Sequence, residues 1–248
     1  MNTPTIIAHR GGKDEAEENS AESFADALSH GILGAETDVR LTRDGHVVIM
    51  HDPTVDRTTT STGHIAEMTL SEVKSLSLRK TGQRVPTLEE FCEVYRGRAD
   101  ADIEIELKLD AGSEQADRMD HYLRSVYKTS SSILAPGTFA FSSFHPATLR
   151  RMRALFPDAA LAFITWSNTA EVILSASLMG CRRLCTVWDN STAHGVVLTH
   201  QAGMTANLWC SDTPEVYRLV SLMGADVSTS NVPRAICAAA AAQIADSR

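Results

Sequence analysis

Short apolar runs alternate along the chain with longer amphipathic stretches, a pattern typical of strands that alternate with helices. Thr5–Ala8 is the first apolar run, and Ser20–His30 is the first stretch with apolar residues at helical spacing. Gly34–Leu41 and Ile103–Leu107 alternate between apolar and polar residues, which predicts strands. A turn signal after the first of these leads to a further strand at Val47–Met50. The pattern therefore predicts a chain built mainly of strand–helix units.

The same alternation continues to the end of the chain. Later strands are expected at 138–142, 160–164, 183–186, 204–208 and 226–228, and helices at 114–127, 146–156, 169–179, 191–202, 213–223 and 233–244. Alternating strands and helices form parallel sheets through right-handed crossovers. About eight such units in 248 residues predict an α/β fold of the TIM (β/α)8 barrel class. The alternative is an open doubly wound sheet, but no G-x-G-x-x-G motif follows the first strand.

Residues 52–100 interrupt this alternation. Their first half is rich in Thr, Ser and Asp, and the stretch predicts only short helices, near 71–76 and at 86–95. It is too long for an ordinary connection between barrel strands. We therefore expect one domain over residues 1–248, with residues 52–100 as a small insertion at the barrel mouth, between the second and third barrel strands.

Charge and cysteine content narrow the class of protein. Lys and Arg number 23 against 31 Asp and Glu, which gives a net charge of −8 and argues against a nucleic-acid partner. No apolar run approaches the roughly 18 residues of a membrane span, and the first residues lack the basic and apolar regions of a signal peptide. The five cysteines contain no C-x-x-C pair, so neither a disulfide framework nor a zinc site is indicated. These features together predict a cytoplasmic location.

Acidic residues stand on two predicted strands, near the ends at which TIM barrels carry their catalytic groups. Glu36 and Asp38 are two apart and share one strand face, as do Glu104, Glu106 and Lys108. Buried carboxylates are costly unless they are paired or bound to a metal. One divalent cation would satisfy both strands, and carboxylate ligands favour Mg²⁺ or Ca²⁺ over Zn²⁺. The alternative is a set of salt-bridged carboxylates at the barrel rim.

Two histidines occupy comparable positions. His9 and Arg10 end the first strand, and His51 and Asp52 end the strand of the hairpin. A lone histidine is more often structural than catalytic, and a lone arginine more often forms a surface ion pair. Because all these groups fall at the ends of early strands, their joint placement favours a catalytic site.

Six segments, in this order along the chain, resemble the glycerophosphodiester phosphodiesterase family of the cytoplasmic bacterial type. They are AHRGG (8–12), EENSAESF (17–24), ETDVRLTRDGHVVIMHDPTVDRTT (36–59), VPTLEEF (85–91), IEIELK (103–108) and SSFHPATL (142–149). Each segment alone is a weak signal, but the ordered set is specific. The resemblance covers nearly the whole chain and is strongest over the first 110 residues.

The resemblance implies metal-dependent hydrolysis of a small glycerophosphodiester to glycerol 3-phosphate and an alcohol. It assigns one divalent cation, Mg²⁺ or Ca²⁺, to Glu36, Asp38 and Glu106, and acid–base roles to His9 and His51. It does not distinguish which histidine is the base. The remaining residues that it implicates are Arg10 and Lys108 at the phosphate, and Glu18, Asn19, Phe144, Glu104 and Trp209 in supporting positions, with Glu104 beside the ligands rather than among them.

The chain departs from the family pattern in three places. Glu17 and Ser20 replace a proline and a threonine around Glu18 and Asn19, which we expect to affect only the turn. The W-T-V-N segment appears as Trp209-Cys210-Ser211-Asp212, and the T-D-x-P segment appears as Ser230-Asn231-Val232-Pro233. The resemblance implies that the strands of the last two segments line the polyol end of the cleft, so these departures bear on substrate identity more than on the reaction.

Three other functions fit parts of the sequence. A phospholipid-headgroup phosphodiesterase or lyase of the same barrel type would need an apolar rim for the bilayer, for which Trp166 is the isolated aromatic candidate. A non-catalytic metal- or phosphate-binding barrel would be expected to lack one of the two histidines. A sugar-phosphate isomerase would need a glycine-rich phosphate site after the last two strands, whereas 208–212 and 228–232 contain no glycine.

Overall fold

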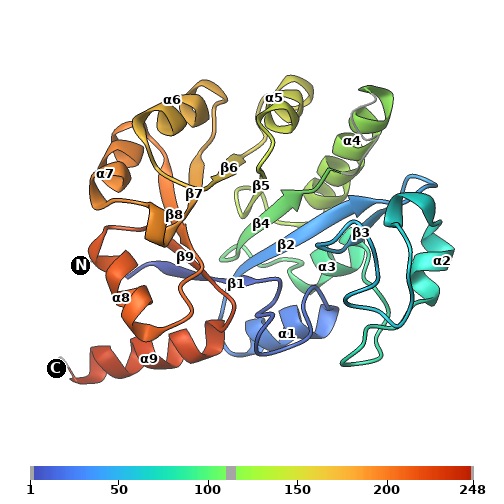
Figure 1. Ribbon diagram of the computed structural model, residues 1–248, viewed down its shortest axis with the longest axis horizontal. Helices are drawn as coiled ribbons and strands as arrows, with labels where there is room; N and C mark the ends of the chain where they lie inside the picture. Colours follow the sequence, from blue (N-terminus) through green and yellow to red (C-terminus); the bar gives the residue numbers. More distant parts are fainter. Residues whose placement is uncertain (1–2, 110–115, 247–248) are drawn as a thin grey trace.

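The computed structural model describes residues 3–109 and 116–246, and its secondary structure follows the predicted alternation of strands and helices (Figure 1). The strands are β1 (Thr5–His9), β2 (Gly34–Leu41), β3 (Val47–Ile49), β4 (Asp102–Leu107), β5 (Phe139–Ser143), β6 (Leu161–Thr165), β7 (Arg183–Val187), β8 (Thr205–Trp209) and β9 (Val227–Ser230). The α-helices are α1 (Ala21–Ser29), α2 (Leu70–Ser75), α3 (Leu88–Val94), α4 (Ala116–Ile133), α5 (Pro146–Leu155), α6 (Ala170–Leu178), α7 (Ala193–Gln201), α8 (Pro214–Leu222) and α9 (Pro233–Asp246). Two 3-10 turns are η1 (Ile65–Glu67) and η2 (Trp188–Asn190).

The parallel strands close into a barrel. Their order is β1-β9-β8-β7-β6-β5-β4-β2, and β2 pairs in turn with β1. The additional strand β3 runs antiparallel to the far end of β2. Helices cover the outside of this sheet (Figure 1). The predicted TIM-barrel class is therefore confirmed, and the open doubly wound alternative is wrong, because the two edge strands of an open sheet do not pair.

Residues 52–100, predicted as an insertion, contain two different parts. The first part packs around its own small core, to which Val55, Ile65 and Val73 contribute. The helix α3 instead places Leu88 and Phe91 in the main core, so it belongs to the outer helical layer of the barrel between β2 and β4. The predicted insertion therefore includes one barrel helix, and the division into one domain with an insertion stays a prediction.

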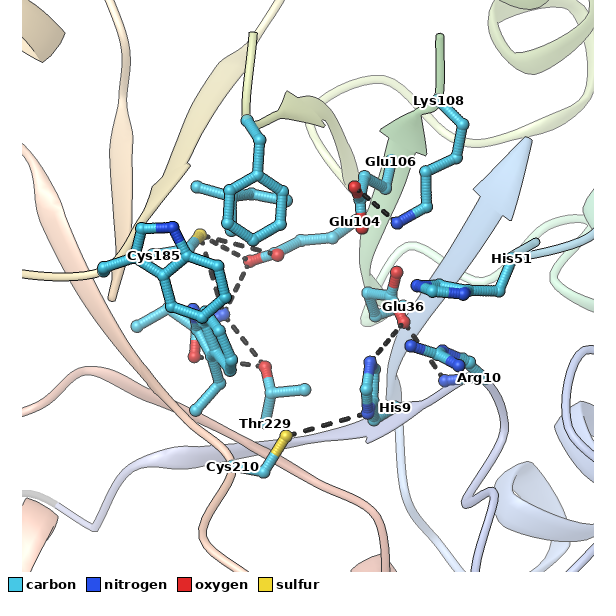
Figure 2. Close-up of a pocket in the computed structure, with 15 residues that line it drawn as sticks. His9, Arg10, Glu36, His51, Glu104, Glu106, Lys108, Cys185, Cys210 and Thr229 are labelled. Atoms are coloured by element: carbon cyan, nitrogen blue, oxygen red, sulfur yellow. Dashed lines mark hydrogen bonds and ion pairs between the residues drawn. The ribbon is translucent and has the colours of Figure 1, made fainter. Parts of the chain in front are cut away.

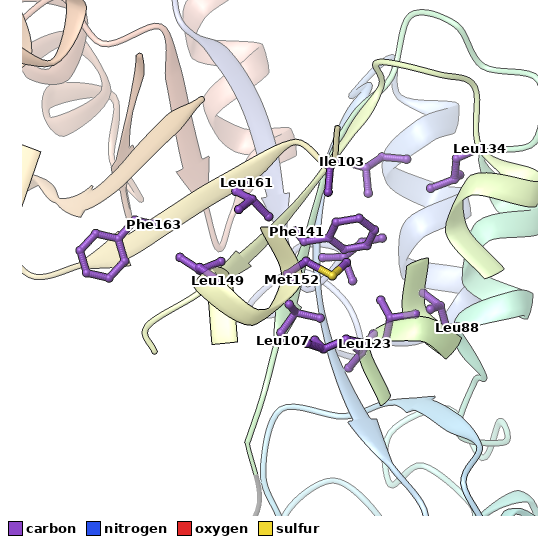
Figure 3. Packing of buried hydrophobic residues seen from close by; sticks show 14 of the residues in the cluster. Leu88, Ile103, Leu107, Leu123, Leu134, Phe141, Leu149, Met152, Leu161 and Phe163 are labelled. Atoms are coloured by element: carbon purple, nitrogen blue, oxygen red, sulfur yellow. The ribbon is translucent and has the colours of Figure 1, made fainter. Parts of the chain in front are cut away.

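The main core lies between the barrel strands and the helices around β4 and β5 (Figure 3). Ile103, Ile105 and Leu107 of β4 face this layer and are fully buried. Because side chains alternate along a strand, the intervening Glu104 and Glu106 face the barrel interior. Apolar packing on the outer face thus holds the acidic residues of the same strand in the centre of the barrel.

Among the described residues, no helix is both long and apolar enough to cross a membrane.

Candidate active site

Strand register places the predicted site residues next to one another. His9 is the register partner of Glu36 on the neighbouring strand. Asp38 is in turn the register partner of Glu106. Strands in the same sheet lie about 4.8 Å apart, so partners whose side chains point to the same face become direct neighbours. The ends of β1, β2 and β4 therefore bring these four residues together inside the barrel mouth.

The three predicted metal ligands form one compact cluster. Glu36, Asp38 and Glu106 are buried, and each offers a carboxylate oxygen within 4.8 Å of the others. Burial, together with the neighbouring carboxylates, raises the pKa of Glu36 well above its usual range and that of Glu106 to about 7. Burial acts in the same direction on Asp38, but Lys108 and Arg10 outweigh it and lower the pKa of that carboxyl.

This donor set fits a divalent cation. Glu36 Oε1 is buried and accepts no hydrogen bond within the part of the chain that the structure describes. A buried carboxylate oxygen without a donor is costly, and a bound cation would remove that cost. The ligands would be oxygens alone, which suits Mg²⁺ or Ca²⁺.

Two cationic side chains lie against the carboxylate cluster. Lys108 Nζ is 2.6 Å from Glu106 Oε1 and 3.0 Å from Asp38 Oδ1. Arg10 Nε is 3.3 Å from Asp38 Oδ2, and its backbone N–H donates to Glu36. The φ of Arg10 is 53°, a left-handed conformation that is uncommon for a residue with a side chain and clusters at functional sites. Both cations contact ligand carboxylates, and both line the same cavity.

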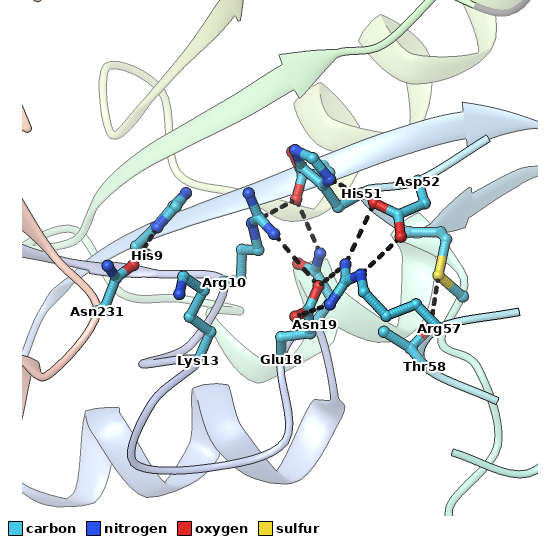
Figure 4. A network of polar contacts seen from close by, with 12 residues as sticks. His9, Arg10, Lys13, Glu18, Asn19, His51, Asp52, Arg57, Thr58 and Asn231 are labelled. Carbon is cyan, nitrogen blue, oxygen red and sulfur yellow. Dashed lines mark hydrogen bonds and ion pairs between the residues drawn. The ribbon is translucent and has the colours of Figure 1, made fainter. Parts of the chain in front are cut away.

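His51 belongs to a chain of polar contacts that also includes Arg10 (Figure 4). Its Nδ1 lies 2.7 Å from Asp52 Oδ1. Arg57 donates to Asp52 and to Glu18, and Arg10 donates to Glu18. Arg57 and His51 bond to the Asp52 carboxylate and, despite partial burial, lower its pKa to about 2. The ring of His51 is thus oriented by a carboxylate that is itself fixed.

Glu18 and Asn19, predicted as supporting residues, both contact this site. Glu18 joins Arg10 to Arg57. Asn19, whose φ is 55°, donates from Nδ2 to Asp38 Oδ2 at 2.8 Å. The turn before α1 therefore holds the Asp38 carboxylate through Asn19, and the replacement of the preceding proline by Glu17 leaves that contact in place.

His9 is positioned by Asn231, which directly follows β9. Its Nδ1 is 2.5 Å from Asn231 Oδ1, and its Nε2 is 3.7 Å from Glu36 Oε2. Burial, helped by the nearby Arg10, lowers the pKa of His9 to about 4. The sequence does not predict the contact with Asn231, because the family resemblance assigns that residue to the polyol end of the cleft. The altered T-D-x-P segment was the available signal.

Glu104 lies in the barrel interior outside the cluster of Glu36, Asp38 and Glu106, with the Cys185 thiol beside its carboxylate (Figure 2). Its Oε1 accepts hydrogen bonds from Arg183 at 2.7 Å and from Asn207 at 3.0 Å. Arg183 also pairs with Asp102. The buried Glu104 carboxylate is thus paired with an arginine of β7.

A cavity of about 300 Å³ opens above these groups (Figure 2). Both histidines, Glu36, Glu106 and the two cations line it on one side. The opposite side carries Phe144, Trp166 and Trp209, whose ring centroids lie 5.4–6.2 Å apart. The cavity therefore offers a charged half for a phosphate and an aromatic half for the carbon skeleton of a small ligand.

We expect Asp52→Asn to lower turnover at least about tenfold, because the substitution removes the carboxylate that orients His51 and supports its protonated form. The measurement is kcat and KM on the best substrate. Asp120→Asn is the matched control, since Asp120 forms an exposed ion pair with Arg151 on the outer helices. Unchanged kcat in Asp52→Asn would exclude a role for this carboxylate.

The structure is therefore an eight-stranded parallel TIM barrel with clustered carboxylates, two histidines and two cations at one mouth. A family model described as the glycerophosphoryl diester phosphodiesterase family matches residues 9–234. The chain belongs to this family.

Individual relatives agree with that assignment. A glycerophosphodiester phosphodiesterase from Caldanaerobacter subterraneus subsp. tengcongensis is 42% identical over 109 residues, which are 42% of this chain and 44% of that protein. Glycerophosphodiester phosphodiesterase 1 of Mus musculus is 41% identical over 94 residues, 35% of this chain and 28% of that protein. The chain thus matches less than half the length of these two curated relatives.

Solved structures match over nearly the whole chain. A phosphodiesterase from Oleispira antarctica, in complex with the product sn-glycerol-3-phosphate, has a TM-score of 0.87 and 26% identity, with 96% of both chains covered. A glycerophosphodiester phosphodiesterase from Thermotoga maritima has a TM-score of 0.75 at 22% identity over the full length of both chains, and this likeness concerns the fold.

Proposed function

We propose that the protein hydrolyses a glycerophosphodiester to glycerol 3-phosphate and an alcohol, with one bound Mg²⁺ or Ca²⁺. The observation that carries the proposal is the convergence of three buried carboxylates, two histidines and two cations at one barrel mouth. The family match over residues 9–234 supports the reaction class. The Oleispira antarctica relative in complex with the product sn-glycerol-3-phosphate supports the product.

Glu36, Asp38 and Glu106 would hold the cation through their carboxylate oxygens. A divalent cation in this position would supply positive charge for a phosphate oxygen and would lower the pKa of a bound hydroxyl or water. Lys108 uses two of the same carboxylates as partners. Its ammonium would therefore turn to the phosphate when these oxygens are occupied, and together with the Arg10 guanidinium it would stabilise charge on the phosphate oxygens.

The two histidines would divide the proton transfers according to their partners. His9 contacts a neutral amide, which does not stabilise an imidazolium, so we assign it as the base that takes the proton of the attacking hydroxyl or water. His51 contacts the carboxylate of Asp52, which favours the protonated ring. We assign His51 as the acid that protonates the departing alcohol.

The test is a substrate screen with the purified protein. Glycerophosphocholine, glycerophosphoethanolamine, glycerophosphoinositol and glycerophosphoglycerol are incubated with Mg²⁺ or Ca²⁺, and release of sn-glycerol 3-phosphate is measured with a coupled enzyme. We expect release from at least one diester with at least one of the two cations. Absence of release from all four diesters under both conditions would contradict the proposed function.

The same screen separates the proposal from a phospholipid-headgroup phosphodiesterase or lyase. Trp166 is 62% exposed beside Phe144 and Trp209, so micelles of lysophosphatidylcholine form one arm of the screen. ³¹P NMR distinguishes a phosphate monoester product from a cyclic phosphate product. Faster turnover of the micelles than of the four diesters, or a cyclic phosphate as the final product, would favour the phospholipid enzyme. A cytoplasmic location, with all five cysteines as free thiols, belongs to this proposal.

A further inference from the structure

Two departures from the family pattern, far apart in the sequence, meet beside His9. Asp212 stands at the asparagine of the W-T-V-N segment, and Asn231 stands at the aspartate of the T-D-x-P segment. In the structure the two side chains bond to each other. Asn231 also contacts the ring of His9, as Figure 4 shows. Relative to the family pattern, the amide and the carboxylate have therefore exchanged positions, and in this chain the two side chains contact each other.

Asp212 accepts hydrogen bonds from both donors of Asn231. The backbone N–H of Asn231 donates to Asp212 Oδ1, and the side-chain Nδ2 donates to Oδ2, each at 2.7 Å. The Ser230 hydroxyl donates to the same carboxylate at 3.1 Å. If the Asn231 amide rotated by 180°, its carbonyl oxygen would face the carboxylate of Asp212, which has no proton to donate. Asp212 therefore fixes which end of the amide faces His9.

The fixed amide decides which nitrogen of His9 carries the proton. Asn231 Oδ1 can only accept, and it lies 2.5 Å from Nδ1 of the ring. Nδ1 must therefore be the protonated nitrogen of the neutral ring, which leaves a lone pair on Nε2. That nitrogen is on the side of Glu36, at 3.7 Å from its carboxylate, and His9 lines the active-site cavity.

The other groups around the His9 ring cannot replace Asn231 as the acceptor for Nδ1–H. Cys210 Sγ is 3.7 Å from Nδ1, and a thiol is a weak hydrogen-bond partner. Arg10 and Lys13, the cations nearest to the ring, have no acceptor. Glu36 faces the other nitrogen. Asn231 is therefore the acceptor that selects the tautomer of His9.

We propose that Asp212 and Asn231 are a positioning pair that holds His9 in its Nδ1–H tautomer and directs the Nε2 lone pair to the reacting atoms. The proposal rests on the proposed function for the role of that lone pair. It assigns the two departures to the proton transfer rather than to substrate choice, because their polar contacts converge on His9.

Single exchanges break the pair in different ways. Asp212→Asn offers Asn231 a second amide, so the Asn231 side chain can rotate and place its Nδ2 against the ring, which would favour the opposite tautomer. Asn231→Asp sets two carboxylates side by side without the connecting N–H. We expect each single variant to lower kcat about 10²-fold, at the lower end of the usual acid–base effect, with KM within about threefold of the parent.

The double exchange Asp212→Asn/Asn231→Asp restores the hydrogen bond between the two side chains, but the residue at position 212 now donates and the residue at position 231 accepts. The new asparagine donates to the new aspartate and still accepts from Ser230, while the aspartate accepts from His9 Nδ1. We expect kcat to return to within about tenfold of the parent, a coupling that independent sites would not show. If the folded double variant is as slow as the slower single variant, the proposal is overturned.

The tautomer itself is measured by ¹⁵N NMR of the imidazole nitrogens at pH 8, without substrate. We expect the parent and the double exchange to show His9 protonated at Nδ1, and Asp212→Asn to lose this signature. A parent ring protonated at Nε2 would overturn the proposal even if the enzyme is active. If no glycerophosphodiester is hydrolysed, the NMR result still tests the pair, so the two failures are distinguishable.

Asp226→Asn is the matched control. Asp226 also contacts a histidine, His200 at 2.7 Å, but it lies next to the amino end of β9, opposite the active site. We expect this variant to change neither kcat nor the signals of His9. Circular dichroism of all variants verifies that the fold is retained.

Discussion

Alanine in place of His9 or of His51 is expected to lower kcat at least about a hundredfold, because a positioned acid or base typically contributes 10²–10⁴-fold. Both rings line the cavity, and neither belongs to a hydrophobic core cluster, so the thermal unfolding temperature should remain close to that of the parent. The measurement is kcat and KM on the best diester of the screen. Near-parent turnover in one variant would remove that histidine from the mechanism.

An activated leaving group separates the two roles. A glycerophosphodiester of p-nitrophenol needs little protonation of the departing oxygen, so it should restore much of the turnover of His51→Ala. The same substrate should leave His9→Ala slow, because the proton of the attacking group still has to be removed. The reverse result would exchange the two assignments. His200→Ala, at the opposite end of the barrel, is the control for the loss of an exposed histidine.

Removal of divalent cations is expected to abolish turnover, and Mg²⁺ or Ca²⁺ is expected to restore it. The physical reason lies in the cluster of Glu36, Asp38 and Glu106, where three carboxylates share one small volume and burial raises the pKa of two of them. The measurement is release of glycerol 3-phosphate after dialysis against EDTA and after stepwise return of each cation. Full activity in excess chelator would contradict the metal assignment.

Thermal unfolding provides a test of the cation site that does not depend on catalysis. A ligand at a hundred times its Kd stabilises the folded state by about 2.7 kcal/mol, which in a chain of this size corresponds to a rise in Tm of roughly 5–10 °C. We expect this rise in the parent and its loss in Glu36→Gln. The control is Glu104→Gln, because Glu104 is paired with Arg183, and this variant should keep the rise whatever its own baseline stability.

The fold and the carboxylate cluster could be predicted from local sequence because both depend on short-range patterns. Alternation along Gly34–Leu41 and Ile103–Leu107 predicts two strands, and spacing by two places their carboxylates on one face. The parallel register then brings Asp38 opposite Glu106. To place the two strands side by side, the prediction needs only a barrel fold in addition. The alternation of strands and helices along the chain predicts that fold.

The partners of the site residues could not be predicted in the same way, because they come from distant parts of the chain. Arg183 reaches Glu104 from β7, 79 residues away, and Arg57 reaches Glu18 across 39 residues. The residues around each arginine do not indicate which carboxylate it pairs with. Asn231 departs from a family motif, but it lies 222 positions from His9 in the sequence, so no local pattern indicates their contact.

Barrel closure sets the order in which this site can be completed during synthesis. β1 is the seam of the barrel and pairs with both β2 and β9, and His9 at its end meets Asn231 across 222 positions of sequence. The carboxylate cluster can form once β4 has paired with β2, but His9 receives its hydrogen-bond partner only when the last strand docks. A nascent chain that already carries the three carboxylates therefore still lacks the partner that orients His9. The contacts with the largest sequence separation, which carry the largest loop-closure entropy, are therefore the ones that complete the surroundings of His9.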